Sequence, residues 1–143
     1  SWSAIMSAKF SLTIKRNDFP KLAPRIERAV NRAIQTSARN IKEHIAQSMA
    51  SPKSGRTYRR GNRVHVASAV GEAPAIDTGN LANSIMLDFP EKGKAIIFTN
   101  VDYAPVLEFG GAKMGARPFF RPALLTEQPV LIDAVETLLK GLI

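Results

Sequence analysis

Residues 22–49 carry one continuous helical repeat of apolar side chains, which constrains the fold more than any other feature of the chain. At 100° per residue, one broad face collects Leu22, Ile26, Val30, Ala33, Ile34, Ile41, Ile45 and Met49. The pattern predicts a long amphipathic helix of roughly eight turns. A helix of this kind is stable only when its apolar face packs against another part of the protein.

The opposite side of the same helix is a narrow cationic stripe. Its members are Lys21, Arg25, Arg28, Arg32 and Arg39. A charged stripe is ordinarily the solvated face of an amphipathic helix. Like charges one turn apart disfavour a helix, however, so a binding role for the stripe is the alternative.

Short alternating segments and a second helix complete the outline. The alternation in residues 9–15 predicts a strand, and residues 85–89 and 95–101 predict a hairpin around Gly93. Residues 103–109 suit a short helix, and an apolar helical stripe follows Pro129, which should break or kink a helix. We therefore expect a single α+β domain over residues 1–143, with the long helix packed on a small antiparallel sheet.

Residues 50–80 lack periodicity and are expected to form an extended basic loop. Its residues 51–65 contain no acid and carry five cations and one tyrosine: Lys53, Arg56, Tyr58, Arg59, Arg60 and Arg63. Residues 1–65 have a net charge of +11 and residues 66–143 a net charge of −3, together the +8 of the chain. This asymmetry suggests either a face for nucleic acid or two faces that complement each other between copies. For the loop we favour docking on neighbouring subunits.

The sequence offers little for catalysis or metal binding. It has no Cys, only two His, and no phosphate-cradling or nucleophile-elbow motif. Asp77, Asp102 and Glu108 could converge on a metal, but the two Asp are explained more simply as turn residues. We expect no catalytic residue, no metal and no cofactor. No apolar run is long enough to span a bilayer and the start does not resemble a signal peptide, so an intracellular protein is the simplest expectation.

Residues 103–124 (YAPVLEFGGAKMGARPFFRPAL) concentrate aromatic residues, Pro and Gly, and we interpret them as a structural corner. Its residues are Tyr103, Phe109, Gly110, Gly111, Pro118, Phe119, Phe120 and Pro122. Tyr103, Val106, Leu107 and Phe109 are expected to pack a short helix on the sheet. The paired glycines suggest at least one residue with positive φ, and Phe119 and Phe120 should hold the start of the last helix.

Four segments of the chain resemble one known family. They are SGRTYRR (54–60), SAVGEAPAIDTGNLANSI (68–85), YAPVLEFGG (103–111) and ARPFFRPAL (116–124). In this order they resemble the neck or tail-completion proteins of long-tailed bacteriophages and prophages, a family similar in role to the lambda Z protein. The resemblance runs from about residue 10 to the end of the chain. It departs from the family at Val70, where a Pro is usual.

The resemblance implies a non-enzymatic virion protein of the head–tail junction, assembled in the bacterial host cytoplasm. It implies a small α+β fold and a ring of subunits, with a hexamer as one option, around a channel that carries viral DNA. Its other partners would be head-closure and tail-tube or terminator proteins, with no membrane. On this basis Lys21, Arg25, Arg28, Arg32 and Arg39 are expected to face the DNA channel.

Two other classes of protein remain open at this point. One is a basic protein that binds DNA or RNA without forming a ring, through the helix stripe and the arginine-rich loop. The other is a small ribonuclease-like toxin, for which Tyr58, Arg59, Arg60 and His65 would be the candidate residues.

Overall fold

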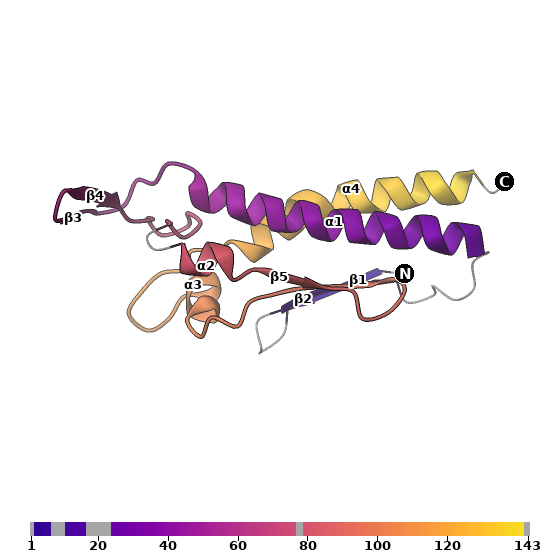
Figure 1. Ribbon diagram of the computed structural model, residues 1–143, viewed down its shortest axis with the longest axis horizontal. Helices are drawn as coiled ribbons and strands as arrows, with labels where there is room; N and C mark the ends of the chain where they lie inside the picture. The colour runs from indigo at the N-terminus through magenta and orange to yellow at the C-terminus, as the bar shows by residue number, and fades with distance from the viewer. Residues whose placement is uncertain (1, 7–10, 17–23, 77–78, 142–143) are drawn as a thin grey trace.

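A computed structural model describes residues 2–6, 11–16, 24–76 and 79–141 of the chain (Figure 1). The two long helices, α1 (Pro24–Ala50) and α4 (Phe120–Lys140), form one layer. A four-stranded antiparallel sheet forms the second layer beneath α1. The predicted α+β fold, with a long helix packed on a small antiparallel sheet and a C-terminal helix, is confirmed.

Helix α1 follows the apolar repeat of the sequence closely. The predicted face supplies Ile26, Val30, Ile34, Ile41, Ile45 and Met49 to the buried core, joined by Ser37 and Ala38. These positions recur every three or four residues, so one side of the helix packs against the sheet and α4. The buried face therefore fixes the cationic stripe on the outer side.

The sheet has the strand order β1-β2-β6-β5. Its strands are β1 (Trp2–Met6), β2 (Ser11–Arg16), β5 (Met86–Asp88) and β6 (Lys94–Phe98). In β6 the burial alternates, with Ala95 and Ile97 fully buried under α1. At the β5–β6 turn, the Gly93 amide donates to the side-chain carbonyl of Asn31 at 3.0 Å, which ties this turn to α1.

Strand β1 was not expected from the sequence. It pairs with β2 along its whole length, from Trp2 opposite Arg16 to Met6 opposite Leu12. Its segment is short and alternates poorly, so its pairing depends on the neighbouring strand rather than on its own pattern. The expected strand at residues 9–15 is β2, whose described part begins at Ser11.

A break or kink was expected at Pro129, and helix α4 continues through this residue without a break. Pro129 lies on the exposed side of α4, while Phe120, Ala123, Glu127, Leu131 and Val135 are buried. Proline removes one amide donor, and on the exposed side water can satisfy the carbonyl that this donor would have paired with. Packing on α1 thus outweighs the local preference against proline.

The contact between α1 and α4 contains a buried polar cluster around Glu127. Its Oε1 atom accepts hydrogen bonds from Ser37 Oγ at 3.1 Å and Asn40 Nδ2 at 2.9 Å. His44 Nε2 lies 4.0 Å from Oε2 of the same carboxyl group. The three α1 residues are spaced by three and four, so one side of α1 presents them together.

The expectation that residues 50–80 form an extended loop is wrong for residues 57–66. They form a β-hairpin from β3 (Thr57–Arg60) and β4 (Arg63–Val66), which projects beyond the end of α1 (Figure 1). Gly61 has φ 62°, which suits the tight two-residue turn with Asn62. Among the described residues, no helix has both the length and the hydropathy to cross a membrane.

Replacing Glu127 by Ala should lower the free energy of unfolding by about 1–3 kcal/mol, because the buried Ser37 hydroxyl would lose its acceptor. Glu127→Gln should cost less, since it keeps a side-chain carbonyl at this place. Glu136→Ala, an exposed position on α4, serves as the control and should have little effect. Urea unfolding of the three variants would measure this, and equal stability of Glu127→Ala and Glu136→Ala would contradict it.

Candidate interaction site

The cationic stripe predicted on α1 is present on the surface of the helix. Arg25, Arg28, Arg32 and Arg39 are all exposed, and they span about 21 Å along the helix axis. The guanidinium of Arg39 lies 5.5 Å from the ring centroid of Phe89, so this arginine also packs on the sheet layer. Lys21, the remaining member, lies outside the described residues.

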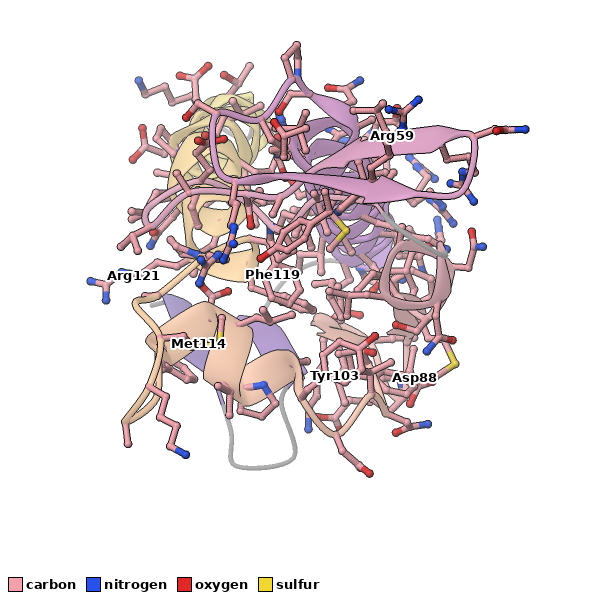
Figure 2. The ribbon with its side chains drawn as sticks, turned by 90° about the vertical axis from the view of Figure 1, so that its left-hand side faces the viewer. Arg59, Asp88, Tyr103, Met114, Phe119 and Arg121 are labelled. Carbon is pink, nitrogen blue, oxygen red and sulfur yellow. The ribbon has the colours of Figure 1, made fainter. Side chains whose placement is uncertain are left out.

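The β3–β4 hairpin presents the other basic residues at one end of the molecule. Figure 2 looks at this end, with Arg59 on the hairpin and Tyr103 on the opposite side of the view. Arg56, Tyr58, Arg59 and Arg63 are exposed, and Val64 is 67 % exposed. A two-stranded hairpin is at best marginally stable on its own, so its attachment to the body matters.

The strand ladder of the hairpin continues toward the body of the protein. The Gly55 amide donates to the Ala67 carbonyl at 2.9 Å, and the Ala67 amide donates to the Arg56 carbonyl at 2.9 Å. A Cβ on Gly55 would lie 2.4 Å from the Ala67 oxygen, so only glycine permits this approach of the two strands. Sequence reasoning missed this role of the glycine in SGRTYRR.

Lys53 belongs to the end of α1 rather than to the arm. Its Nζ donates to the Ser48 carbonyl at 2.5 Å, which places a cation at the helix C-terminus. Burial lowers the pKa of Lys53, and the nearby Glu72 partly opposes that shift. Glu72 in turn accepts hydrogen bonds from the amide and hydroxyl of Ser54, and the hydroxyl contact is the main reason that its pKa is lowered.

Arg117 joins the hairpin exit to helix α3 (Ala104–Phe109). Its amide donates to the Leu107 carbonyl at 2.6 Å, and its guanidinium donates to the carbonyls of Ser68 (3.2 Å) and Gly115 (3.0 Å). The adjacent Gly71 amide donates to the Ala116 carbonyl at 2.9 Å. Residues from three segments distant in sequence therefore meet beside the hairpin, and we call this region the joint.

Glu108 fixes the start of α4 and is part of the same joint. The side chain is 4 % exposed, and its Oε1 accepts from the amides of Phe119 (3.3 Å), Phe120 (2.6 Å) and Arg121 (3.3 Å). These are first-turn amides that have no partner within the helix. A carboxyl group at a helix N-terminus also interacts favourably with the helix dipole. Glu108 was considered in the sequence only as a metal ligand, and its capping role was missed.

The aromatic residues of the corner divide into two groups. Phe119 and Phe120 are fully buried, with an edge-to-face contact at 5.0 Å, as expected for residues that hold the start of α4. The packing expected for Tyr103, Val106 and Phe109 is wrong, because they are 48 %, 42 % and 60 % exposed. Helix α3 buries Ala104 and Glu108 instead, so its other side points outward.

The prolines and glycines of the corner also take distinct roles. Pro118 precedes α4 and Pro122 lies in its first turn, where proline is tolerated. Gly110 has φ 82°, which confirms the expected positive φ in the glycine pair. A Cβ on Gly110 would lie 3.1 Å from the Ala116 amide nitrogen, whereas on Gly111 it would meet only a side-chain methyl group of Val106.

A hollow of about 380 Å³ lies between the hairpin base, α3 and helix α2 (Asn80–Asn83). His65, Met49, Leu81, Tyr103 and Arg117 are among its lining residues. Ser68 also lines it, so its polar groups include two hydroxyls and one imidazole. The hollow is an open pocket beside the joint.

The described residues do not assemble a catalytic or metal constellation from the candidates. Within them, no group of three His, Cys, Asp or Glu could hold a metal ion. Asp102 is an exposed turn residue, Glu108 caps α4, and Asp77 lies outside the described residues. The hairpin register pairs Tyr58 with His65 but Arg59 with Val64, so Arg59 points to the other face. Of these candidate ribonuclease residues, Tyr58 and His65 therefore share one face, and Arg59 lies on the other.

Gly110→Ala should lower the free energy of unfolding by about 1 kcal/mol or more, because an L side chain disfavours positive φ. Gly111→Ala should cost less, since its new methyl group meets only the exposed Val106 side chain. Thermal unfolding of the two variants compares them directly. A larger loss for Gly111→Ala would contradict this assignment.

The stability of the protein should also depend on the titration of Glu108. Burial raises the pKa of its carboxyl group, although the three amides and Arg121 oppose the shift. The folded state then binds the proton more tightly than the unfolded state, a stabilisation lost as pH rises through the raised pKa. The stability of the parent relative to Glu108→Gln should therefore fall as the pH rises above the ordinary pKa of a glutamate, about 4. Urea unfolding at several pH values would measure this difference, and a rise would contradict the assignment.

Comparisons of the chain with protein-family models, with curated proteins and with solved structures give no match.

Proposed function

We propose that this protein is a structural, non-enzymatic component of the head–tail junction of a long-tailed bacteriophage. In this role it acts as a neck or tail-completion protein, assembling in the bacterial host cytoplasm into a ring around the DNA channel. Its partners are further copies of itself, head-closure proteins, tail-tube or terminator proteins, and viral DNA. The ring joins tails to heads in the virion.

The observation that carries the proposal is the projecting β3–β4 hairpin. It is built as an arm, held at its base by the Gly55–Ala67 ladder and beside it by the joint, while its tip reaches beyond the helices (Figure 1). Val64, Val66 and Tyr58 are exposed on the arm. Exposed apolar side chains on a projecting hairpin are suited to contact a partner surface. In a ring, that surface belongs to the neighbouring copy.

The four segments that resemble the neck family support the same proposal. Gly55, Gly71, Glu108 and Ala116 come from these segments, and each makes a backbone contact or cap at the hairpin base or the joint. The shared sequence signature therefore corresponds to the machinery that orients the arm and starts α4. A family that depends on the direction of such an arm would need these residue types at these places.

The α1 stripe supplies the second surface that a ring around DNA requires. Arg25, Arg28 and Arg32 lie on a rigid helix and point away from the core. A channel that passes a polyanion needs cations or at least a wall that does not repel phosphate. We assign the stripe to the channel and the hairpin to contacts between subunits.

A nucleic-acid-binding protein that acts without a ring remains the second candidate. The observation in its favour is the cationic hairpin, which could contact phosphates as a monomer. The two candidates differ in self-assembly, because only the first requires an ordered oligomer.

Val64→Asp should prevent ring formation, since it places a charge on the apolar part of the arm without touching the core. Val130→Asp, at an exposed valine on α4, is the matched control and should assemble normally. Negative-stain electron microscopy of purified protein would show the rings, with circular dichroism to confirm folding. In phage production, Val64→Asp should leave heads and tails unjoined, whereas Arg28→Glu with Arg32→Glu should give joined particles that lose DNA. Ordered rings and infectious particles with Val64→Asp would rule out the docking role of the hairpin.

A further inference from the structure

The two faces of the β3–β4 hairpin carry different chemistry. Residues alternate between the faces of a strand, and the register pairs Tyr58 with His65 and Arg59 with Val64. One face therefore presents Arg56, Tyr58, Arg63 and His65, and we call it the cation-aromatic face. The other, the valine face, presents Thr57, Arg59, Val64 and Val66. The even spread of cations along the sequence conceals this separation.

The cation-aromatic face is partly ordered in advance. The guanidinium of Arg56 lies 5.4 Å from the centroid of the Tyr58 ring, as in a cation–π contact. Holding the arginine on a ring reduces the conformational freedom that binding would otherwise remove. Tyr58 on β3 is 42 % exposed, and Arg63 on the paired strand β4 is also exposed, so a ligand can reach both side chains.

No acidic residue close in the sequence compensates the positive charge of this face. No Asp or Glu occurs between Glu43 and Glu72. Glu72 itself is engaged by the amide and hydroxyl of Ser54 at the hairpin base. Glu43 accepts a hydrogen bond from Gln47 on α1. The face therefore presents cations beside an aromatic ring without an acid of its own.

We propose that the cation-aromatic face binds the phosphodiester backbone of nucleic acid. Arginine guanidinium groups recognise phosphate by charge and by directed hydrogen bonds. A two-stranded β-ribbon is narrow enough to enter the major groove of duplex DNA. The Tyr58 ring could also stack on a base of a single strand. This binding surface goes beyond the ring and its channel stripe, and it does not require the ring to form.

The test is a titration of the full-length protein with fluorescently labelled DNA at several salt concentrations. Each phosphate contact adds about one to the slope of log affinity against log salt. Arg63→Gln and Arg56→Gln should each lower that slope by about one. Arg59→Gln removes the same charge from the valine face, at a position between Arg56 and Arg63 in the sequence, and should leave the slope unchanged. Thermal unfolding of each variant confirms that its fold is retained.

A second arm compares a duplex of about 20 base pairs with a single strand of the same sequence. A selective loss of single-strand affinity in Tyr58→Leu identifies a stacked base beside the phosphates. If Tyr58→Leu lowers the affinity for both DNA forms equally, or for neither, the ligand is the phosphate backbone alone. Either result is compatible with the proposal, provided that the arginine variants behave as expected.

Several results would overturn the proposal. The first is that the protein does not bind DNA at low salt. The second is that Arg59→Gln and Arg63→Gln lower the salt slope equally. The third is that only the double variant Arg28→Gln with Arg32→Gln lowers it. Normal DNA binding but lost self-assembly in Arg63→Gln would assign this face to subunit docking instead. Because the assay uses isolated protein and short DNA, its failure is distinct from a failure of head–tail joining.

Discussion

The cap that Glu108 places on α4 is the interaction on which the arrangement of this protein depends most. A helix that starts in the interior exposes several amides without partners, and leaving them unsatisfied there costs free energy. One buried carboxyl group accepts from three of these amides and thereby fixes α4 relative to α3. From that start, α4 runs back along α1 and places Glu127 against Ser37 and Asn40. One side chain thus fixes where the second long helix begins, and packing on α1 sets its course.

The joint also explains how a narrow hairpin can project from a small domain. The guanidinium of Arg117 donates to carbonyls on the hairpin exit and in its own loop, and its backbone amide donates to α3, so one residue restrains three segments. Gly55 lets the two strands approach at the base. The arm is therefore firmly oriented where it leaves the body, while its tip remains accessible. This is a suitable construction for a surface that acts on another molecule.

Much of the fold follows from patterns in the sequence. The helical repeat of residues 22–49 and the alternation around Gly93 predict α1 and the β5–β6 hairpin, because burial of one face imposes those periods. Three features escaped prediction. Strand β1 depends on pairing with β2. The β3–β4 hairpin carries cations, whereas strands usually show an alternation of apolar and polar residues. Helix α4 tolerates Pro129 because this residue lies on its exposed side. In each, a contact or environment distant in sequence outweighs local propensity.

The sequence by itself determined the fold class, the apolar and cationic faces of α1, and a positive φ within the Gly110-Gly111 pair, because periodicity and backbone sterics act locally. It also supplied the basic residues of the hairpin, but not their arrangement. Only the tertiary structure decided that Glu108 caps α4, that Tyr103 and Phe109 point outward, and that Arg59 lies on the opposite face from Tyr58 and His65. These outcomes depend on strand register and on which face of a six-residue helix finds a partner, and both are set by segments distant in the chain.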